Sequence, residues 1–582
     1  MIRQVVVSPI SRSRALALSK LTRSPAGKTI NLPLDPWFAS MAFISRLRVT
    51  QDAGARQVGT IILLLVLGLE ASAAMLGGDS TWDTRNYHLY NPFALLTGKW
   101  RTDIATAQLQ SYLPPTLDIP YYLLIRRIGD TRLLNILLEI PHAVAVVLAF
   151  LLSLRLLRAT DPVSRLTAAV AILIGVTGAA TMPFMATAMS DMVGVSLVLG
   201  GLLLLVSEVP SQDLPVIRFG AAGLLCGAAV GLKLTFVSAA GGLCLAVLAL
   251  PASGASAMLL RLLALGCGGV LGGLLTGGWW WALAWQAWGN PLFPFFNNIF
   301  HSPLLGLGSL PDVLLARRSA TMPESFFVAL LFPFLWGSPL TWQAYFHQSV
   351  IEFHIRDPRI GIALIAVITI LICSIRREFR SSAQIFVAIF FLASFILWEA
   401  TDPAVRYLSF LELLTGALMA VCAIEFVRTP KGRRAVLFGL VFVLGALRLV
   451  TVYPGPERAS GHSPPLQANV PRVSDDGLVV LLDGSPLAYL ALFEPVSVRF
   501  VGANNNLIHP GGSTLLDRDV ADAVSGQNHD VWGLESPEAS PGEADRVLAF
   551  YGLERSSCSW VRTNLVDSGH VRMCQLSRAG HS

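Results

Sequence analysis

The fold is decided by the stretch Ile61-Ile-Leu-Leu-Leu-Val-Leu-Gly-Leu-Glu-Ala-Ser-Ala-Ala-Met75 and the polar segment that follows it, Asp79-Ser-Thr-Trp-Asp83-Thr-Arg-Asn-Tyr87-His88. The first part is apolar enough for a membrane span. The second part places two carboxylates, an imidazole and aromatic rings where that span ends. Because removing an unpaired carboxylate from water is costly, these acids either stay hydrated or have a chemical task.

The composition of the whole chain is that of a membrane protein. Of its 582 residues, 53% are hydrophobic and only 14% are charged, whereas soluble domains are about a quarter charged. The net charge of +6 does not indicate a nucleic-acid partner. The Arg and Lys residues cluster in particular loops instead, which indicates how the chain is oriented in a membrane.

The order of apolar and basic segments predicts an all-α polytopic membrane protein with about eleven transmembrane helices. Residues 1–57 are basic and are predicted to be cytoplasmic, with Met41 as an alternative start. The basic loops at 376–380 and 428–434 fall on the same side by this count. We expect spans near residues 58–76, 132–157, 166–182, 191–208, two within 219–250, 262–285, 360–375, 383–398, 406–427 and 435–452.

The predicted transmembrane domain, residues 58–452, has two large outer loops at about 77–131 and 286–359. Within it, residues 219–250 are rich in Gly and Ala, which lets helices approach closely in lipid. A Trp-rich segment from Trp279 to Trp288 predicts an aromatic belt at the outer interface. The apolar piece at 326–336 is short for a full span.

The composition changes after residue 453, where the long apolar runs stop. We expect a linker at 453–477 and then a small α/β domain, periplasmic by the span count, that ends at residue 582. Strands are predicted at 477–482 and 496–501 and helices at 515–524 and 543–551. Two further strands carry Cys558 and Cys574, whose disulfide would place the domain in an oxidising compartment. The alternative is two free thiols in a cytoplasmic tail.

The first outer loop holds the strongest candidates for acid/base chemistry. Asp79 and Asp83 are four residues apart and would share one face of a helix. Two neighbouring carboxylates raise the pKa of one of them, which suits a proton acceptor near neutral pH. The alternative is that both acids only hydrate the end of a span, and that Tyr87 and His88 belong to an aromatic belt.

Three charged residues lie at the ends of later spans. Asp191 begins an apolar span, where an ionisable group indicates function, unless it only stabilises a helix N-terminus. Lys233 has no acid near it in sequence, so it either pairs with a distant carboxylate or contacts an anion. Arg406, followed by Tyr407, has the planar fork that suits phosphate; the alternative is that it anchors its helix at the headgroups.

Several common catalytic motifs are missing from the sequence. It contains no nucleotide-binding loop, no His/Cys metal spacing and no Gly-x-Ser-x-Gly motif. The energy for any reaction would therefore come from the substrate itself.

The order of short motifs resembles the GT-C superfamily of membrane glycosyltransferases, in particular bacterial relatives of the protein mannosyltransferases and of the lipid A aminoarabinose transferase. The resemblance rests on Trp82-Asp83-Thr-Arg-Asn-Tyr87-His88-Leu, Leu96-Thr-Gly-Lys-Trp100, Leu113-Pro-Pro, Gly231-Leu-Lys233-Leu-Thr235, Gly289-Asn-Pro-Leu-Phe-Pro294 and Arg406-Tyr407-Leu. It covers roughly residues 58–430.

The resemblance implies an inverting transfer of a sugar from a polyprenyl-phosphate donor to a hydroxyl of a lipid, glycan or protein acceptor, at the outer face of the bacterial inner membrane. It implies that Asp83 is the general base, with Asp79 in reserve. Asp191 would position the acceptor or a divalent cation, and Lys233 and Arg406 would hold the donor phosphate. Tyr87, His88 and Tyr407 would be further substrate contacts. The first loop lacks the adjacent acids that are commonest in the family, so the base and the need for a metal stay open.

Two other functions fit the sequence. A transporter or flippase of lipid-linked sugars would use Asp191 and Lys233 as charges along its pathway, near the middle of the membrane. A non-catalytic scaffold for envelope enzymes would act through its C-terminal domain. The enzyme hypothesis predicts instead that Asp83, Asp191, Lys233 and Arg406 converge on one externally open cavity.

Overall fold

The computed structural model describes residues 53–206, 214–306, 325–335, 355–376, 381–427, 429–455, 457–459, 464–527, 530–566 and 569–579. The predicted cytoplasmic segment up to residue 52, the alternative start Met41, most of the 376–380 loop and parts of the 286–359 loop lie outside these residues. Residues 57–582 form one compact unit, which contains the helical part and the C-terminal domain.

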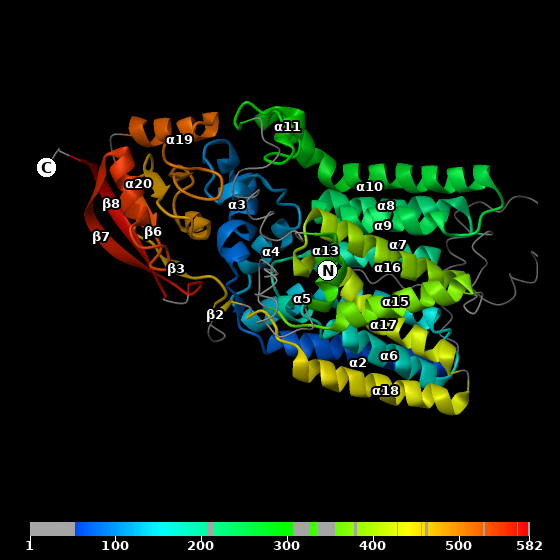
Figure 1. Ribbon diagram of the computed structural model, residues 1–582. Coiled ribbons are helices and arrows are strands. Elements are labelled where there is room, and N and C mark those ends of the chain that lie inside the picture. The colour runs from blue at the N-terminus through cyan, green and yellow to red at the C-terminus, as the bar shows by residue number, and fades with distance from the viewer. Residues whose placement is uncertain are drawn as a thin grey trace, which may run out of the picture. The chain divides into compact units, whose positions relative to one another are not determined.

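Most of the described chain up to residue 450 is helical, and its long helices run side by side (Figure 1). The longer ones are α2 Ala53–Ala74, α5 Thr131–Leu156, α10 Ala255–Trp288, α16 Ser382–Thr401, α17 Ser409–Phe426 and α18 Pro430–Val450. The shorter apolar ones are α6 Pro162–Val176, α7 Asp191–Leu205, α8 Val216–Leu232, α9 Val237–Leu248, α13 Phe326–Leu335 and α15 Arg359–Ile375.

Five helical segments of the described chain are long and apolar enough to cross a membrane: α2, α5, α10, α16 and the segment Val405–Phe426 that includes α17. Helix α17 is central to the bundle, since its residues are buried without interruption from Ser409 to Val421. A helix that is buried all round belongs to the core of a large protein or a membrane bundle. The predicted helical membrane protein is thereby confirmed in its class, while the number of spans and their orientation stay predictions.

Glycines on α8 and α10 let these two helices touch through their backbones. A Cβ atom added at Gly272 of α10 would lie 2.0 Å from the carbonyl oxygen of Leu224, and one added at Gly227 of α8 would lie 1.9 Å from that of Gly269. The small residues predicted to permit close packing therefore do so. Helix α8 makes this close contact with α10, which follows the two spans predicted within residues 219–250.

The C-terminal domain is built on a six-stranded sheet with the strand order β3-β7-β8-β6-β4-β5. The strands are β3 Ala468–Asn469, β4 Leu478–Leu481, β5 Arg499–Gly502, β6 Val531–Glu535, β7 Leu553–Thr563 and β8 His570–Arg578, and the helices are α19 Leu515–Gly526 and α20 Glu543–Tyr551. Strand β4 is parallel to β5 and β6, while β8 is antiparallel to β6 and β7. The predicted α/β class is confirmed. Cys558 and Cys574 face each other on β7 and β8 and are joined by a disulfide.

The first loop and the C-terminal domain are joined edge to edge. Ile104 extends the sheet beyond β5: its N–H donates to the carbonyl oxygen of Phe500 at 3.1 Å, and its carbonyl accepts from the N–H of Gly502 at 2.9 Å. Lys99 is fully buried beside them, 3.1 Å from the carboxylate of Asp103. Two hydrophobic clusters also combine first-loop and C-terminal residues. The two segments therefore share their core.

The segment predicted as a linker, 453–477, makes specific contacts with the helical part. It contains β2 Arg458–Ala459, which pairs with β1 Gly78–Asp79 at the beginning of the first loop. This pairing also corrects the expectation that Asp79 and Asp83 share a helix face. Asp79 lies in a strand, and only Asp83 lies in the helical turn that continues as η2 Thr84–His88.

The close contact between α8 and α10 gives a test of the helix packing. Gly272→Leu should force the two backbones apart, which costs about 1–3 kcal/mol in overpacked cores, and should lower the unfolding temperature in detergent. Gly266→Leu on the same helix is the matched control, because a Cβ at Gly266 meets nothing within 4 Å. Equal unfolding temperatures for the two variants would contradict this packing.

Candidate functional site

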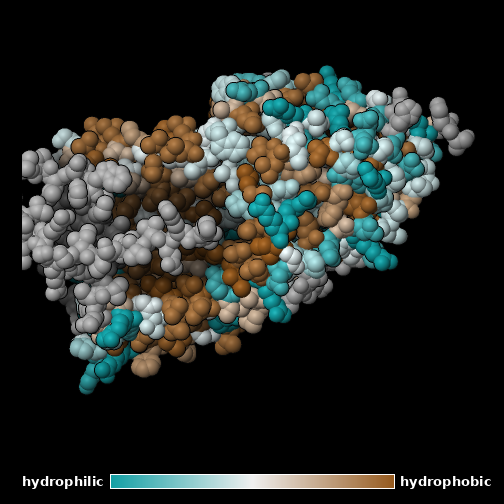
Figure 2. Space-filling view, turned by 180° about the vertical axis from the view of Figure 1, so that it is seen from behind, coloured by the Kyte–Doolittle hydropathy of each residue, from teal (hydrophilic) through white to brown (hydrophobic). Residues whose placement is uncertain are grey.

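A cavity of about 860 Å³ lies between the first loop, the ends of several helices and the C-terminal domain. Its charged lining residues include Asp83, Asp118, Lys233 and Arg406. Its apolar wall includes Leu234, Val237, Trp281, Leu292 and Phe296. Figure 2 shows the helical part hollowed and hydrophobic on its rear face, beside the more polar surface of the C-terminal domain. The size is that of a small-molecule site.

Asp83 and Arg406 form an ion pair in the wall of this cavity. The Arg406 guanidinium donates to the Asp83 carboxylate at 2.5 Å, and the Tyr87 hydroxyl donates to the same oxygen at 3.3 Å. Burial alone would raise the pKa of Asp83, but Arg406, His88 and Lys233 outweigh it and hold that pKa below its ordinary value. Asp83 is therefore ionised at neutral pH.

Lys233 and Asp191 form a second ion pair close to the first. The chain leaves helix α8 at Lys233, whose ammonium donates to Asp191, the first residue of α7, at 2.5 Å. The ammonium also lies 5.1 Å from the centre of the Tyr407 ring, and the Arg406 guanidinium lies 5.2 Å from that centre. Both cations thus share one aromatic neighbour.

The structure brings together most of the residues singled out from the sequence. Asp83, Tyr87, His88, Lys233, Arg406 and Tyr407 all line the cavity. Asp191 does not line the cavity, but it forms an ion pair with Lys233, which does. The carboxylate that Lys233 lacked in the sequence is therefore Asp191, from a helix that precedes it by about 40 residues.

Asp79 has a different environment from Asp83 and is not one of the cavity-lining residues. Its carboxylate accepts hydrogen bonds from the N–H of Thr81 at 2.9 Å, the hydroxyl of Thr84 at 2.7 Å and the N–H of Ala188 at 2.8 Å. These contacts tie the first loop to the loop between α6 and α7. Asp79 is thus placed to stabilise the fold.

Three other buried acids hold the loop between α6 and α7 in the same way. Asp357 accepts from the N–H of Ala179 at 2.9 Å, Glu412 from that of Ala180 at 3.0 Å, and Glu139 from that of Ala186 at 2.8 Å. The loop ends at Met189, whose sulfur lies 3.4 Å from the Arg406 guanidinium. Backbone contacts to carboxylates therefore fix the segment that borders Arg406.

His88 and Asp118 form a pair, of which the sequence reasoning singled out only His88. The Nδ1 atom of His88 lies 2.6 Å from the Asp118 carboxylate, and both side chains are about 95% buried while lining the cavity. Asp118 begins the short helix α4 Asp118–Ile125. It lies in the same predicted outer loop as His88, and that shared location was the signal available in the sequence.

The C-terminal domain contributes to the cavity through Asn506. The Asn506 side-chain oxygen accepts from the N–H of Leu109 at 2.8 Å, and its side-chain NH₂ group donates to the side-chain oxygen Oε1 of Gln110 at 3.3 Å. Asn86 donates to the Ala107 carbonyl and also reaches the same Gln110 oxygen at 3.4 Å. The side-chain oxygen of Gln110 therefore accepts two hydrogen bonds, and Gln110 itself lines the cavity. No feature of the sequence predicted that Asn506 lines the cavity.

Two further charged residues missed by the sequence reasoning connect the segment after α18 to the first loop and to the loop between α6 and α7. The buried Arg85 pairs with Glu457, a cavity-lining residue, at 2.9 Å. Arg458 donates to backbone carbonyls of the loop between α6 and α7, among them Ala186 at 3.1 Å. Both contacts join segments more than 250 residues apart, a pairing that spacing alone does not reveal.

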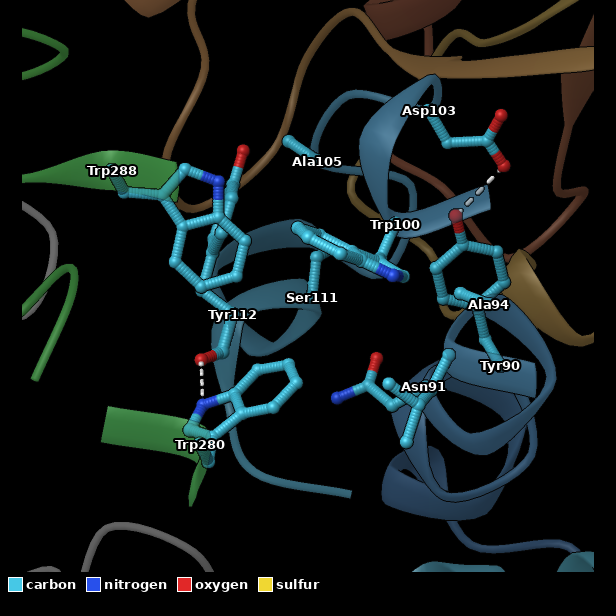
Figure 3. A pocket seen from close by; sticks show the side chains of 11 residues that line it. Tyr90, Asn91, Ala94, Trp100, Asp103, Ala105, Ser111, Tyr112, Trp280 and Trp288 are labelled. Atoms are coloured by element: carbon cyan, nitrogen blue, oxygen red, sulfur yellow. Dashed lines mark hydrogen bonds between the residues drawn. The ribbon is translucent and has the colours of Figure 1, made fainter. Parts of the chain in front are cut away.

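An aromatic cluster beside the cavity fixes the end of α10 against the first loop. Trp288 packs edge-on against Tyr112 with ring centroids 4.9 Å apart, and the Trp280 ring nitrogen donates to the Tyr112 carbonyl at 3.3 Å (Figure 3). Trp279 and Trp285 are 40% and 57% exposed. Only some of the Trp residues in the predicted interfacial belt are therefore exposed at the protein surface.

The acids in and next to the cavity are not arranged as a set of metal ligands. Asp83 is paired with Arg406, Asp118 with His88, and Asp191 with Lys233. Within the described ranges, no group of three or more His, Cys, Asp or Glu residues is arranged to hold a metal ion. The donor set therefore does not fit the divalent cation that the resemblance left open.

The sequence matches no protein-family model and no curated protein. Among solved structures, the chain is similar to crystal structures of ArnT from Cupriavidus metallidurans, one bound to undecaprenyl phosphate and one in the apo state, at 14% and 15% identity. Both comparisons cover 90% of this chain and 98% of ArnT, with a TM-score of 0.38.

The contacts of Asp79 predict a structural role that can be measured. Asp79→Ala would leave the buried N–H groups of Thr81 and Ala188 without their acceptor, at a cost of about 1–3 kcal/mol each. The unfolding temperature in detergent should fall by several degrees. Asp475→Ala removes an exposed acid and is the control. An unchanged unfolding temperature for Asp79→Ala would refute the assignment.

Proposed function

We propose that this protein is a membrane glycosyltransferase that moves a sugar, with inversion, from a polyprenyl-phosphate donor to an acceptor hydroxyl. We place the reaction at the outer face of the bacterial inner membrane, with the N-terminus cytoplasmic and the C-terminal domain periplasmic. The observation that carries the proposal is the cavity itself. It combines the cations Lys233 and Arg406, the ionised carboxylate of Asp83 and an apolar wall beside helices of membrane-spanning length.

The two cations are suited to the phosphate of the donor. When the bond between the sugar and the phosphate breaks, negative charge grows on the departing phosphate, and fixed cations in a water-poor site stabilise that charge. Lys233 and Arg406 both line the cavity and both lie about 5 Å from the Tyr407 ring. In the proposed complex the donor phosphate lies near this ring, within reach of both side chains.

The apolar wall is suited to the lipid part of the donor. Leu234 and Val237 are both partly exposed and line the cavity with Trp281, Leu292 and Phe296. Apolar surface of this kind favours a hydrocarbon chain over water. A polyprenyl chain could therefore lie along the wall while its phosphate reaches the cations.

Asp83 is suited to take the proton from the acceptor. In the proposed step its carboxylate removes the hydroxyl proton, the acceptor oxygen bonds to the anomeric carbon, and the carbon–phosphate oxygen bond breaks. The polyprenyl phosphate leaves with the electron pair. Attack from the side opposite the phosphate inverts the anomeric centre.

The ion pair with Arg406 links the strength of this base to donor binding. Without the donor, Arg406 contributes to holding the pKa of Asp83 below its ordinary value, and a carboxylate with a low pKa is a weak base. A donor phosphate would draw the guanidinium toward itself and add a negative charge nearby. Both effects raise the pKa of the carboxyl group, so Asp83 would become a better base once the donor is bound.

The main test is the loss of sugar transfer when Asp83 is changed. Asp83→Asn keeps the shape of the side chain but cannot accept the proton, so transfer from a radiolabelled polyprenyl-phosphate sugar to a membrane extract should fall by roughly a hundredfold or more. Asp475→Asn, an exposed acid of the C-terminal domain, should remain active. A fully active Asp83→Asn variant would exclude Asp83 as the base.

The role of the cations is tested by donor binding. Lys233→Gln combined with Asp191→Asn removes both charges together, so no buried charge is left unpaired. We expect the KM for the donor to rise roughly tenfold or more, as for the loss of a charge-assisted contact. The KM for the acceptor should change little. An unchanged donor KM would show that Lys233 does not hold the phosphate.

A further inference from the structure

The pair formed by His88 and Asp118 is not used by the reaction proposed above. Both residues line the cavity, and their side chains are almost fully buried. Among the described residues, the Nδ1 atom of His88 contacts Asp118, whereas its Nε2 atom has no hydrogen-bond partner. A buried polar atom without a partner costs about 1–3 kcal/mol. Such an atom, on a ring that lines a cavity, needs an explanation.

The contact with Asp118 decides which ring nitrogen carries the proton. Burial raises the pKa of Asp118 above its ordinary value, although the neighbouring His88 opposes this rise. Above that pKa the carboxylate is ionised and only accepts hydrogen bonds, so a neutral His88 must place its proton on Nδ1. The other nitrogen, Nε2, is then left with a free lone pair. Asp118 thus makes His88 Nε2 a hydrogen-bond acceptor of fixed direction, which is the arrangement in which a carboxylate orients a working imidazole.

The chemistry that matches a lone acceptor in a mostly apolar wall is a hydroxyl group. Lys233 and Arg406 already supply the cations for a phosphate, and a neutral imidazole nitrogen would repel one. A hydroxyl can donate to Nε2 and still accept from another group, such as the NH₂ group of Gln110. Both substrates of the proposed reaction carry hydroxyls.

We infer that His88, oriented by Asp118, binds a hydroxyl group of a substrate through its Nε2 atom. This inference rests on the proposed function for the origin of the hydroxyl, which belongs either to the sugar being transferred or to the acceptor. Asp83 remains the proton acceptor. His88 fixes the position of the hydroxylated ring or chain, and Asp118 is a positioning residue that acts through His88.

The inference has a consequence for pH dependence. The charged groups that face His88 are Asp118 on α4, Asp83 before η2 and Lys233 after α8. Burial lowers the pKa of His88, but the two carboxylates outweigh burial and Lys233, so that pKa lies above its ordinary value of 6.5. Only the neutral ring can accept from a hydroxyl. Activity should therefore be lost as the pH falls through the pKa of His88.

Asp118→Asn is the decisive variant, because it keeps the size of the side chain while removing the charge. The tautomer of His88 is then no longer fixed, and kcat/KM should fall roughly ten- to a hundredfold for a lost or misdirected hydrogen bond. The pKa of His88 should also fall, which moves the acid limb of the pH profile to lower pH. A purely structural role for Asp118 would not move that limb.

The measurements use the purified full-length protein in detergent, with a polyprenyl-phosphate sugar as donor. A rise in KM for the donor assigns the hydroxyl to the transferred sugar, and a rise in KM for the acceptor assigns it to the acceptor. His88→Phe should show the same loss with no acid limb from this group. Asp475→Asn is the control. Unchanged kcat/KM and an unmoved acid limb in Asp118→Asn would overturn the inference.

A second readout separates this inference from the proposed function. In protein labelled with ¹⁵N at histidine, the side-chain nitrogen shifts of His88 should report a proton on Nδ1 in the wild type and a mixture in Asp118→Asn. Adding the polyprenyl-phosphate sugar or a hydroxylated acceptor lipid should shift the Nε2 signal, whereas bare polyprenyl phosphate should not. If the wild type transfers no sugar, the proposed function fails, but this readout still decides the inference. No Nε2 response to either hydroxylated ligand would overturn it.

Discussion

The site depends on two ion pairs, Asp83–Arg406 and Asp191–Lys233, each of which joins segments far apart in the sequence. Burying a single charge is costly, and removing one partner of a buried pair typically costs about 3–5 kcal/mol. Each pair therefore holds together the elements that carry it. The first loop is fixed to the turn just before α17, and the end of α8 is fixed to the beginning of α7. The same charges that hold the cavity together are those a phosphate ligand would contact.

The first loop can hold its acids in place because it is braced from both sides. On one side, Ile104 adds to the sheet of the C-terminal domain, and the buried pair Lys99–Asp103 anchors the loop next to it. On the other side, Asp79 ties it to the loop between α6 and α7. A catalytic group on a loop requires this kind of support, because a displacement of about 1 Å already reduces rates strongly. The C-terminal domain thus forms part of the site's framework, and Asn506 reaches the cavity itself.

The sequence predicted the class of fold because hydropathy is a local property. The apolar runs, the strands at 477–482 and 496–501 and the cysteine-bearing final strands all follow from short-range patterns. What it did not predict depends on long-range pairing: the strand pairing of β2 with β1, the role of Asn506, and the partnership of Asp118 with His88. Lys233 shows the limit well. No acid lies near Lys233 in the sequence, which correctly indicated that its partner is either a distant carboxylate or an anion. Only the structure identifies Asp191 as that carboxylate. Asp79 and Asp83 were equivalent by spacing and differ only through their partners.

That difference in partners separates two kinds of buried acid in this protein. One kind accepts hydrogen bonds from backbone N–H groups; Asp79, Glu139, Asp357 and Glu412 hold the loop between α6 and α7 in this way. The other kind, Asp83 and Asp191, is paired with a cation that lines the cavity. An incoming anion can compete for a side-chain cation, because the long side chain can turn toward it. It cannot compete for backbone groups that are fixed by the surrounding fold. Binding of a phosphate would therefore draw Arg406 and Lys233 away from Asp83 and Asp191 and leave the contacts of the structural acids unchanged, so that only the two ion pairs respond to the donor.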